Sequence, residues 1–302
     1  MNIFTEKFLE KKKDKILQEI NDHGYCFIEK AVNEKFIQNI INDVEKNKFF
    51  INRNWISGVY TKTQYYLTNI LGCSESFYKL VTDENIINIC DDYMLEKNFR
   101  LKAARYYETF SNHHMHWHTD NKVGKIFSDI DGLIFIVYLQ NVDDGEFQYI
   151  KNSHKFSGDV KINNFTDTEI DQKYSKDIVS FKAEKGSLIA YNTRGIHRAK
   201  KVQKKSTFVR KSLFFQVDSD FKSSEPMLLD VSFVKTRSEK LLRYLGLGYP
   251  STNKIYPDTS ILTLPPKKII NFLFVKYLFK IIIDNIINLI PQKIKNFIKN
   301  KF

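Results

Sequence analysis

The sequence predicts an α+β chain that is mainly β, with helices at the N-terminus, a β-rich body and an amphipathic C-terminal helix. Apolar residues recur at helical spacing through much of the first hundred residues. From about residue 101, short apolar or alternating runs dominate, separated by Gly, Asp and Asn. We therefore expect a helix-rich part over 1–100, a β core over 101–235, and a linker with a basic tail over 236–302.

Two amphipathic helices are expected at the start of the chain. The first covers residues 5–22, and the second covers residues 34–46, with Phe36, Ile37 and Ile40 on its inward face. A short extended piece, GYCFIEK, joins them. Residues 83–97 predict a further helix, because their apolar side chains again fall on one face.

The β core is expected from a series of short runs typical of strands. The first is LKAARYYETF, the longest apolar one is GLIFIVYLQNV, and the last is STFVRKSLFFQV. The polar stretch between His154 and Phe181 has little periodicity, so we expect a loop there. A stretch with four of the six prolines, residues 246–266, predicts a linker.

The segment WHTDN predicts a metal site. In a strand the side chains alternate between faces, so His118 and Asp120 point the same way. One imidazole and one carboxylate on a common side, joined by a second imidazole, form the facial triad of oxygen-activating Fe(II) enzymes. His116 shares this side and could replace His118 as a ligand, whereas Trp117 should face the core.

The remaining parts of such a site follow later in the chain. His197 comes seventy-nine residues after His118, at the end of the run GSLIAYNTRGIH. Arg210 follows thirteen residues later, where a basic group would reach into a barrel and bind the distal carboxylate of 2-oxoglutarate. Alternation allows only one of Arg210 and Lys211 to face inward and does not choose between them; bidentate carboxylate recognition favours arginine.

These motifs resemble those of the phytanoyl-CoA dioxygenase family over roughly residues 20–220. The similar segments are GYCFIEKAVNEKFIQNI, HTD, YLQNVDDGEFQYIKNSHK, KGSLIAYNTRGIH and FVRK, with KNSH standing where that family has PGSH. The resemblance implies a double-stranded β-helix (a jelly roll) flanked by helices. It implies His118, Asp120 and His197 as the iron ligands and Arg210 as the 2-oxoglutarate anchor. With a carboxylate at Asp120, it also implies a hydroxylase that uses Fe(II), 2-oxoglutarate and O₂.

Two rival functions remain open at this point. The chain could be an inert jelly-roll protein that binds or scaffolds and retains the metal site. It could also be a metal-dependent enzyme without 2-oxoglutarate, which would leave Arg210 unexplained. We expect the substrate to be a small molecule or a lipid-linked one. The sequence does not assign roles to His113, His114 or His116, and it leaves a homo-oligomer open.

Net charge and cysteine content indicate which partners and which cellular compartment to expect. From Lys235 onward there are thirteen Lys and Arg and three acids, a net charge of +10, so the preceding residues carry only +2 of the total +12. A nearly neutral body argues against nucleic acid as a partner. Three widely spaced cysteines and a charged N-terminus predict a reducing, cytoplasmic setting.

The tail holds an apolar stretch from Ile269 to Ile290 that is long enough to cross a bilayer. However, Lys276, Lys280 and Asp284 interrupt it, and charges in mid-span are costly in hydrocarbon. An interfacial helix with its lysines toward anionic lipid is one reading. Packing of this helix on the β core or on a second subunit is the other.

Overall fold

The computed structural model describes residues 2–47, 58–68, 70–95, 97–120, 130–156, 165–203, 209–219, 227–236, 238–247, 261–263, 275–276, 278–283, 285–286 and 291. The chain divides into two compact units, Met1–Thr263 and Leu264–Phe302. The first unit holds the sheets and most of the helices, and the second is described separately below.

Two antiparallel sheets form the first unit. The large sheet has the order β1-β8-β5-β10-β4-β3-β2, and the small sheet has the order β7-β6-β9. A parallel pair, β11 with β12, lies apart from both. The strands are β1 (Tyr25–Ile28), β2 (Gly58–Tyr60), β3 (Gln64–Leu67), β4 (Arg100–Thr109), β5 (Gly132–Tyr138), β6 (Val142–Ile150), β7 (Ile178–Ala183), β8 (Leu188–Asn192), β9 (His197–Ala199), β10 (Arg210–Asp218), β11 (Met227–Leu229) and β12 (Ile261–Thr263).

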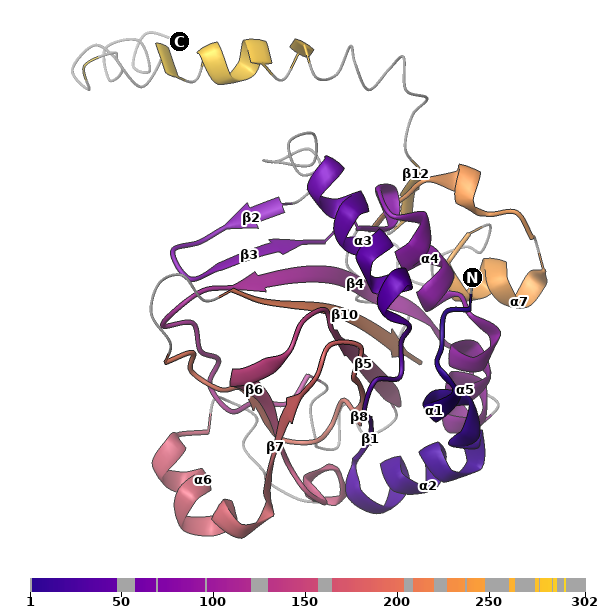
Figure 1. Cartoon of the computed structure of the whole chain (residues 1–302), viewed down its shortest axis with the longest axis vertical. Helices are drawn as coiled ribbons and strands as arrows, with labels where there is room; N and C mark the ends of the chain where they lie inside the picture. Colours follow the sequence, from indigo (N-terminus) through magenta and orange to yellow (C-terminus); the bar gives the residue numbers. More distant parts are fainter. Residues whose placement is uncertain are drawn as a thin grey trace, which may run out of the picture. The chain divides into compact units, whose positions relative to one another are not determined.

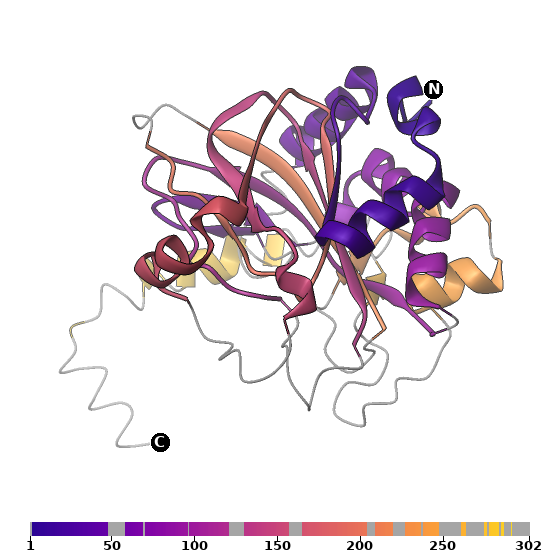
Figure 2. The same cartoon turned by 90° about the horizontal axis from the view of Figure 1, so that it is seen from below.

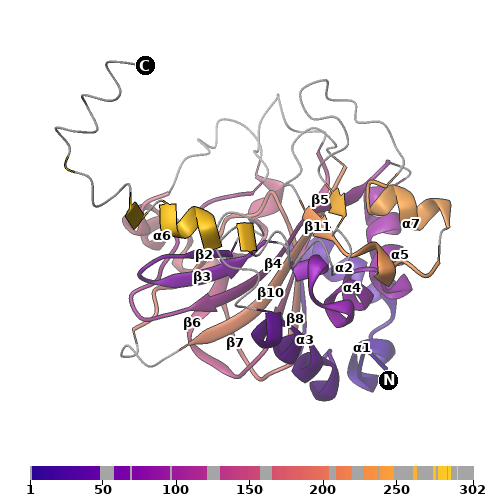
Figure 3. The ribbon, with the colours of Figure 1, turned by 90° about the horizontal axis from the view of Figure 1, so that it is seen from above.

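The helices lie mostly against one face of the large sheet (Figures 1 and 3). Those expected over 34–46 and 83–97 are confirmed, and the one expected over 5–22 is interrupted at Lys11 and Lys12. The helices are α1 (Glu6–Glu10), α2 (Lys13–His23), α3 (Glu34–Asn47), α4 (Glu75–Val81), α5 (Glu84–Met94), α6 (Asp167–Tyr174) and α7 (Glu239–Tyr244).

Both faces of the large sheet are buried, which explains its apolar strands. On β5, Phe135 and Val137 pack toward the helices, and Leu213 and Phe215 of β10 do the same. The alternate residues of the large sheet face the small sheet and pack against its aromatic side chains. A strand covered on both sides needs apolar residues at successive positions, so GLIFIVY lacks alternation. The residues packed between the two sheets are Ile134, Tyr138, Val142, Phe147, Tyr149, Phe181, Ile189 and Tyr191.

The prediction of a loop between His154 and Phe181 is wrong in part, because α6 forms within this stretch. Thr166 caps this helix: its hydroxyl accepts from the backbone N–H of Glu169, whose carboxylate accepts in return from the backbone N–H of Thr166. Ile170 supplies a buried anchor. The Thr-x-x-Glu pattern was the available signal, and the weak periodicity hid it. Figure 2 shows α6 on the side of the small sheet, away from the N-terminal helices.

The linker and tail are described only in part. Residues 248–260 and 264–266 of the expected linker lie outside the described residues, as do Lys293, Lys295, Lys299 and Lys301 of the basic end. In the second unit, residues 275–276, 278–283 and 285–286 are helical. Among the residues that the structure describes, no helix is both long enough and apolar enough to cross a membrane.

Candidate metal centre

His118 and Asp120 lie in an extended segment that pairs with the chain around His197. The backbone N–H of His118 donates to the carbonyl oxygen of His197 at 3.0 Å, and the N–H of His197 donates back at 2.9 Å. The N–H of Asp120 donates to the carbonyl oxygen of Thr193 at 3.0 Å. This pairing holds the two histidines side by side, with their ring centroids 4.4 Å apart.

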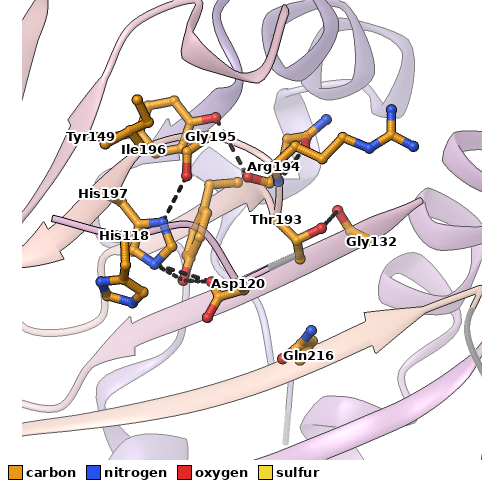
Figure 4. A network of polar contacts seen from close by, with 12 residues as sticks. His118, Asp120, Gly132, Tyr149, Thr193, Arg194, Gly195, Ile196, His197 and Gln216 are labelled. Atoms are coloured by element: carbon orange, nitrogen blue, oxygen red, sulfur yellow. Dashed lines mark hydrogen bonds and ion pairs between the residues drawn. The ribbon is translucent and has the colours of Figure 1, made fainter. Parts of the chain in front are cut away.

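The two imidazoles are oriented by backbone carbonyls. Nδ1 of His118 lies 2.7 Å from the carbonyl oxygen of His116, and Nδ1 of His197 lies 2.9 Å from that of Gly195. A carbonyl can only accept, so each Nδ1 carries a proton, and Nε2 is the nitrogen of each ring that remains to bind a metal ion. Figure 4 shows the rings and the carboxylate of Asp120 turned toward one another. Metal-binding histidines are commonly fixed in this way.

The three predicted ligands meet in space. His118, Asp120 and His197 each offer a ligand atom within 4.8 Å of the others, and Nε2 of His197 lies 3.1 Å from Oδ2 of Asp120. The side chain of His197 is buried, whereas that of Asp120 is 22% exposed. Two imidazole nitrogens and one carboxylate match the donor set of a facial triad. The residues present therefore fit a divalent iron.

The protonation states also suit a metal. Burial lowers the pKa of His118, and nearby His197 lowers it further. Burial would raise the pKa of Asp120, but the charge and hydrogen bond of His197 outweigh that effect and hold this pKa below its usual value. At neutral pH the site thus presents a neutral imidazole and an ionised carboxylate. These are the forms that bind metal ions.

Tyr191 is a member of this site that the sequence reasoning missed. It lies on β8, and its hydroxyl donates to Oδ2 of Asp120 at 3.3 Å and lies 3.4 Å from Nε2 of His197. The side chain is fully buried between the two sheets. Its hydroxyl orients Asp120 from outside the ligand set. The only signal for Tyr191 in the sequence was its position. It lies on the strand that precedes His197, two residues after Ile189, so the two side chains share a face.

Gly195 is required by close packing beside His197. A Cβ at this position would lie 1.7 Å from Oη of Tyr149 and 2.0 Å from its Cζ. Tyr149 is itself buried, so it has little room to move. Only glycine therefore allows the chain to turn here and present its carbonyl to Nδ1 of His197.

The structure resolves the choice between Arg210 and Lys211. Arg210 faces the cavity that contains the triad, whereas Lys211 forms ion pairs with Glu45 and Glu108 away from it. Arg210 is 6% exposed, and its guanidinium donates to Oγ1 of Thr109 at 3.3 Å. Its Nε has no hydrogen-bond partner among the described residues. A buried guanidinium with unused donors is suited to an anionic ligand.

The cavity combines polar and apolar walls. Two arginines line it, Arg210 on β10 and Arg105 on β4. The guanidinium of Arg105 donates to Oη of Tyr107 at 2.8 Å and lies 5.4 Å from the ring centre of Phe214. Among the described lining residues, the only carboxylate is Asp120. The other lining residues include Gln64, Met115, Ile136, Tyr138, Phe147 and Ser212.

The other histidines of the HHMHWH tract take different positions. His116 is exposed and is not part of the cluster that could hold a metal among the described residues. Trp117 is fully buried, as expected, with the guanidinium of Arg198 over its ring at 4.3 Å. His113 lies outside the strands and helices but is buried, and its Nδ1 lies 3.2 Å from Oγ1 of Thr63.

His113 should make the stability of the protein pH-dependent. Burial, and secondarily the charge of Arg210, lowers the pKa of His113 from 6.5 to about 4. As the pH falls from 6.5 toward 4, the unfolded chain therefore binds a proton that the folded chain refuses, and stability decreases. Between pH 7 and pH 5 the wild type should lose about 2 kcal/mol of unfolding free energy relative to His113→Asn.

Urea denaturation of both proteins at the two pH values measures this difference. His114→Asn, at the exposed neighbouring position, is the control and should retain the wild-type pH dependence. A His113→Asn variant whose stability changes with pH as the wild type's does would show that His113 is not held neutral.

Solved structures of other proteins share the fold of this chain. The crystal structure of HygX from Streptomyces hygroscopicus with nickel, 2-oxoglutarate and hygromycin B bound superposes with a TM-score of 0.54, covering 78% of this chain and 96% of that one at 14% identity. The carbocyclase SnoK of nogalamycin biosynthesis, described as non-haem and α-ketoglutarate-dependent, gives 0.54 over 69% and 85% at 14% identity. The chain shares their fold.

A third structure agrees with these two. The epimerase SnoN, in complex with Fe³⁺, α-ketoglutarate and nogalamycin RO, gives a TM-score of 0.53 over 68% of this chain and 82% of that one, also at 14% identity. No family model matches the sequence, and no curated protein does. At such low identity the likeness concerns the fold. The chemistry must be argued from the site itself.

Proposed function

We propose that this protein is an Fe(II)- and 2-oxoglutarate-dependent oxygenase that hydroxylates a small-molecule substrate, on a double-stranded β-helix scaffold of the phytanoyl-CoA dioxygenase type. One observation carries the proposal: two imidazoles, a carboxylate and a buried arginine converge on a single cavity. The fold shared with 2-oxoglutarate-dependent enzymes supports it.

Each residue has a defined task in this proposal. His118, Asp120 and His197 would hold the iron, and Arg210 would bind the distal carboxylate of 2-oxoglutarate through its planar guanidinium. With both bound, iron, 2-oxoglutarate and O₂ supply the oxidising power that inserts one oxygen atom into a substrate C–H bond, with release of succinate and CO₂. Phe147 and Ile136 line the same cavity and exclude water from it.

The cavity also suggests the kind of substrate. Met115 and Phe214 provide apolar surface, while Gln64 and Arg105 provide polar contacts on the β3–β4 side. Since Arg210 would bind 2-oxoglutarate, Arg105 would be the cation of this wall that contacts the substrate, and a cation contacts an acidic group most favourably. A small molecule with an apolar portion and a carboxylate or phosphate fits best. A lipid-linked substrate would meet the same description.

Product analysis tests the proposed function. The protein, Fe(II), 2-oxoglutarate and isotopically labelled O₂ would be incubated with a panel of carboxylated small molecules, with Asp120→Ala as the control. We expect succinate and a product heavier by one labelled oxygen, both absent with Asp120→Ala. A product of unchanged mass would show that the reaction is epimerisation, and a product lighter by two hydrogens would show that it is ring closure. No succinate with any substrate would favour the inert scaffold.

A further inference from the structure

The helical residues 275–276, 278–283 and 285–286 expose an apolar stripe. Elsewhere among the described residues, large exposed hydrophobic side chains occur singly, at Leu9, Leu95 and Met115. In this segment six occur together, each between 41% and 63% exposed. Their positions, Val275, Leu278, Phe279, Ile282, Ile283 and Ile286, follow the spacing that places side chains on one face of a helix. Soluble surfaces rarely leave such a stripe uncovered.

Basic residues border this stripe. Lys276 and Lys280 are exposed and one helical turn apart, next to the apolar positions. The sequence adds four lysines between residues 293 and 301, with no acid after Asp284. From Lys235 onward the net charge is +10, whereas the preceding residues carry only +2. Of this +10, the unit Leu264–Phe302, which holds the stripe, carries +7, from eight lysines and one acid.

We propose that this segment binds the surface of a bilayer that contains anionic lipid, lying in the interface with its apolar stripe down. A protein partner would cover the stripe equally well, but lysine is depleted at protein–protein interfaces. Interfacial helices combine a Leu-, Ile- and Phe-rich face with lysines that reach anionic headgroups. The lysines beside the stripe thus select a lipid surface. This proposal does not depend on the proposed enzymatic function.

Vesicle co-sedimentation of the full chain tests the proposal. The vesicles would be phosphatidylcholine alone, or phosphatidylcholine with about one-third phosphatidylglycerol. We expect partitioning onto the anionic vesicles to be at least about tenfold stronger, since each lysine near the surface adds about 1 kcal/mol, and to weaken as salt is added. Phe279→Asp combined with Ile283→Asp should reduce binding at least about tenfold.

Matched variants separate the contribution of the apolar stripe to vesicle binding from that of the lysines. Leu9→Asp introduces one such negative charge at an exposed hydrophobic residue of the first unit and should leave vesicle binding unchanged. Lys276→Gln with Lys280→Gln should reduce the preference for anionic vesicles. Vesicle binding that is absent, or equal for both lipid compositions, would overturn the proposal. Self-association would also overturn it. If light scattering shows that the wild type self-associates and that Phe279→Asp/Ile283→Asp does not, the stripe binds a second copy of the chain and not a lipid surface.

Discussion

Replacing His118 with alanine should abolish tight binding of a divalent metal ion. The proposed site has three ligands, and the remaining pair, Asp120 and His197, would not fix the ion on one face of an octahedron. Loss of an outer partner of a metal site already costs about 10- to 100-fold in affinity, so loss of a ligand should cost about 100-fold or more. Anaerobic calorimetric titration with Fe(II), or with Co(II) as a redox-stable substitute, measures the change.

His116→Ala is the matched control for this variant. His116 lies in the same segment and shares the expected side of the strand, but its side chain is exposed and its structural contribution is the backbone carbonyl that receives Nδ1–H of His118. That carbonyl persists in the alanine variant, so metal affinity should stay within about threefold of the wild type. An equal loss in both variants would place His116 among the ligands. Undiminished affinity in His118→Ala would remove His118 from them.

Replacing Arg210 with glutamine should abolish 2-oxoglutarate binding while leaving metal binding intact. Arg210 is buried, donates to Oγ1 of Thr109 at 3.3 Å, and does not belong to the metal cluster found among the described residues. A bidentate guanidinium–carboxylate pair contributes about 3 kcal/mol, so the dissociation constant for 2-oxoglutarate should rise roughly 100-fold. Titration of the metal-loaded variant with 2-oxoglutarate measures the dissociation constant, and the metal titration described above checks the site.

Two neighbouring cations provide controls for Arg210. Lys211→Gln changes the adjacent residue, which pairs with Glu45 and Glu108 instead of facing the cavity. Arg105→Gln changes the other arginine of the cavity, which already hydrogen-bonds Tyr107. Both should retain 2-oxoglutarate affinity within about threefold. If Arg105→Gln loses as much 2-oxoglutarate affinity as Arg210→Gln, the distal carboxylate of the cosubstrate points toward Arg105 and not toward Arg210.

The core of the site could be predicted from the sequence because its geometry is local. His118 and Asp120 are two residues apart in an extended segment, so alternation alone places them on one side. His197 follows an apolar run that predicts a strand, and Arg210 lies within another. The choice between Arg210 and Lys211 rested on the chemistry of carboxylate recognition, which favours arginine, because both faces of this strand are mixed in sequence and alternation does not decide. It is decided by the packing of Leu213 and Phe215 against the helices, which turns Arg210 to the other face.

Features that depend on tertiary packing escaped the sequence reasoning. The hydroxyl of Tyr191 reaches Asp120 only because β8 and the segment around His118 approach in space. The same holds for Arg105, which enters the cavity from β4. The β2–β3 hairpin was not predicted within the part expected to be rich in helices, 1–100, because its strands are only three and four residues long. Strands this short carry too few alternations to be recognised.

The central claim is that one cavity holds iron and 2-oxoglutarate together. Anaerobic titration of the Fe(II)-loaded protein with 2-oxoglutarate tests it most directly, because the chelate has a weak visible charge-transfer band. We expect the band to grow to saturation in the wild type and to be absent in His118→Ala. A folded, iron-loaded wild-type protein that shows no band at any 2-oxoglutarate concentration would contradict the claim, and the metal site would then serve another cosubstrate or none.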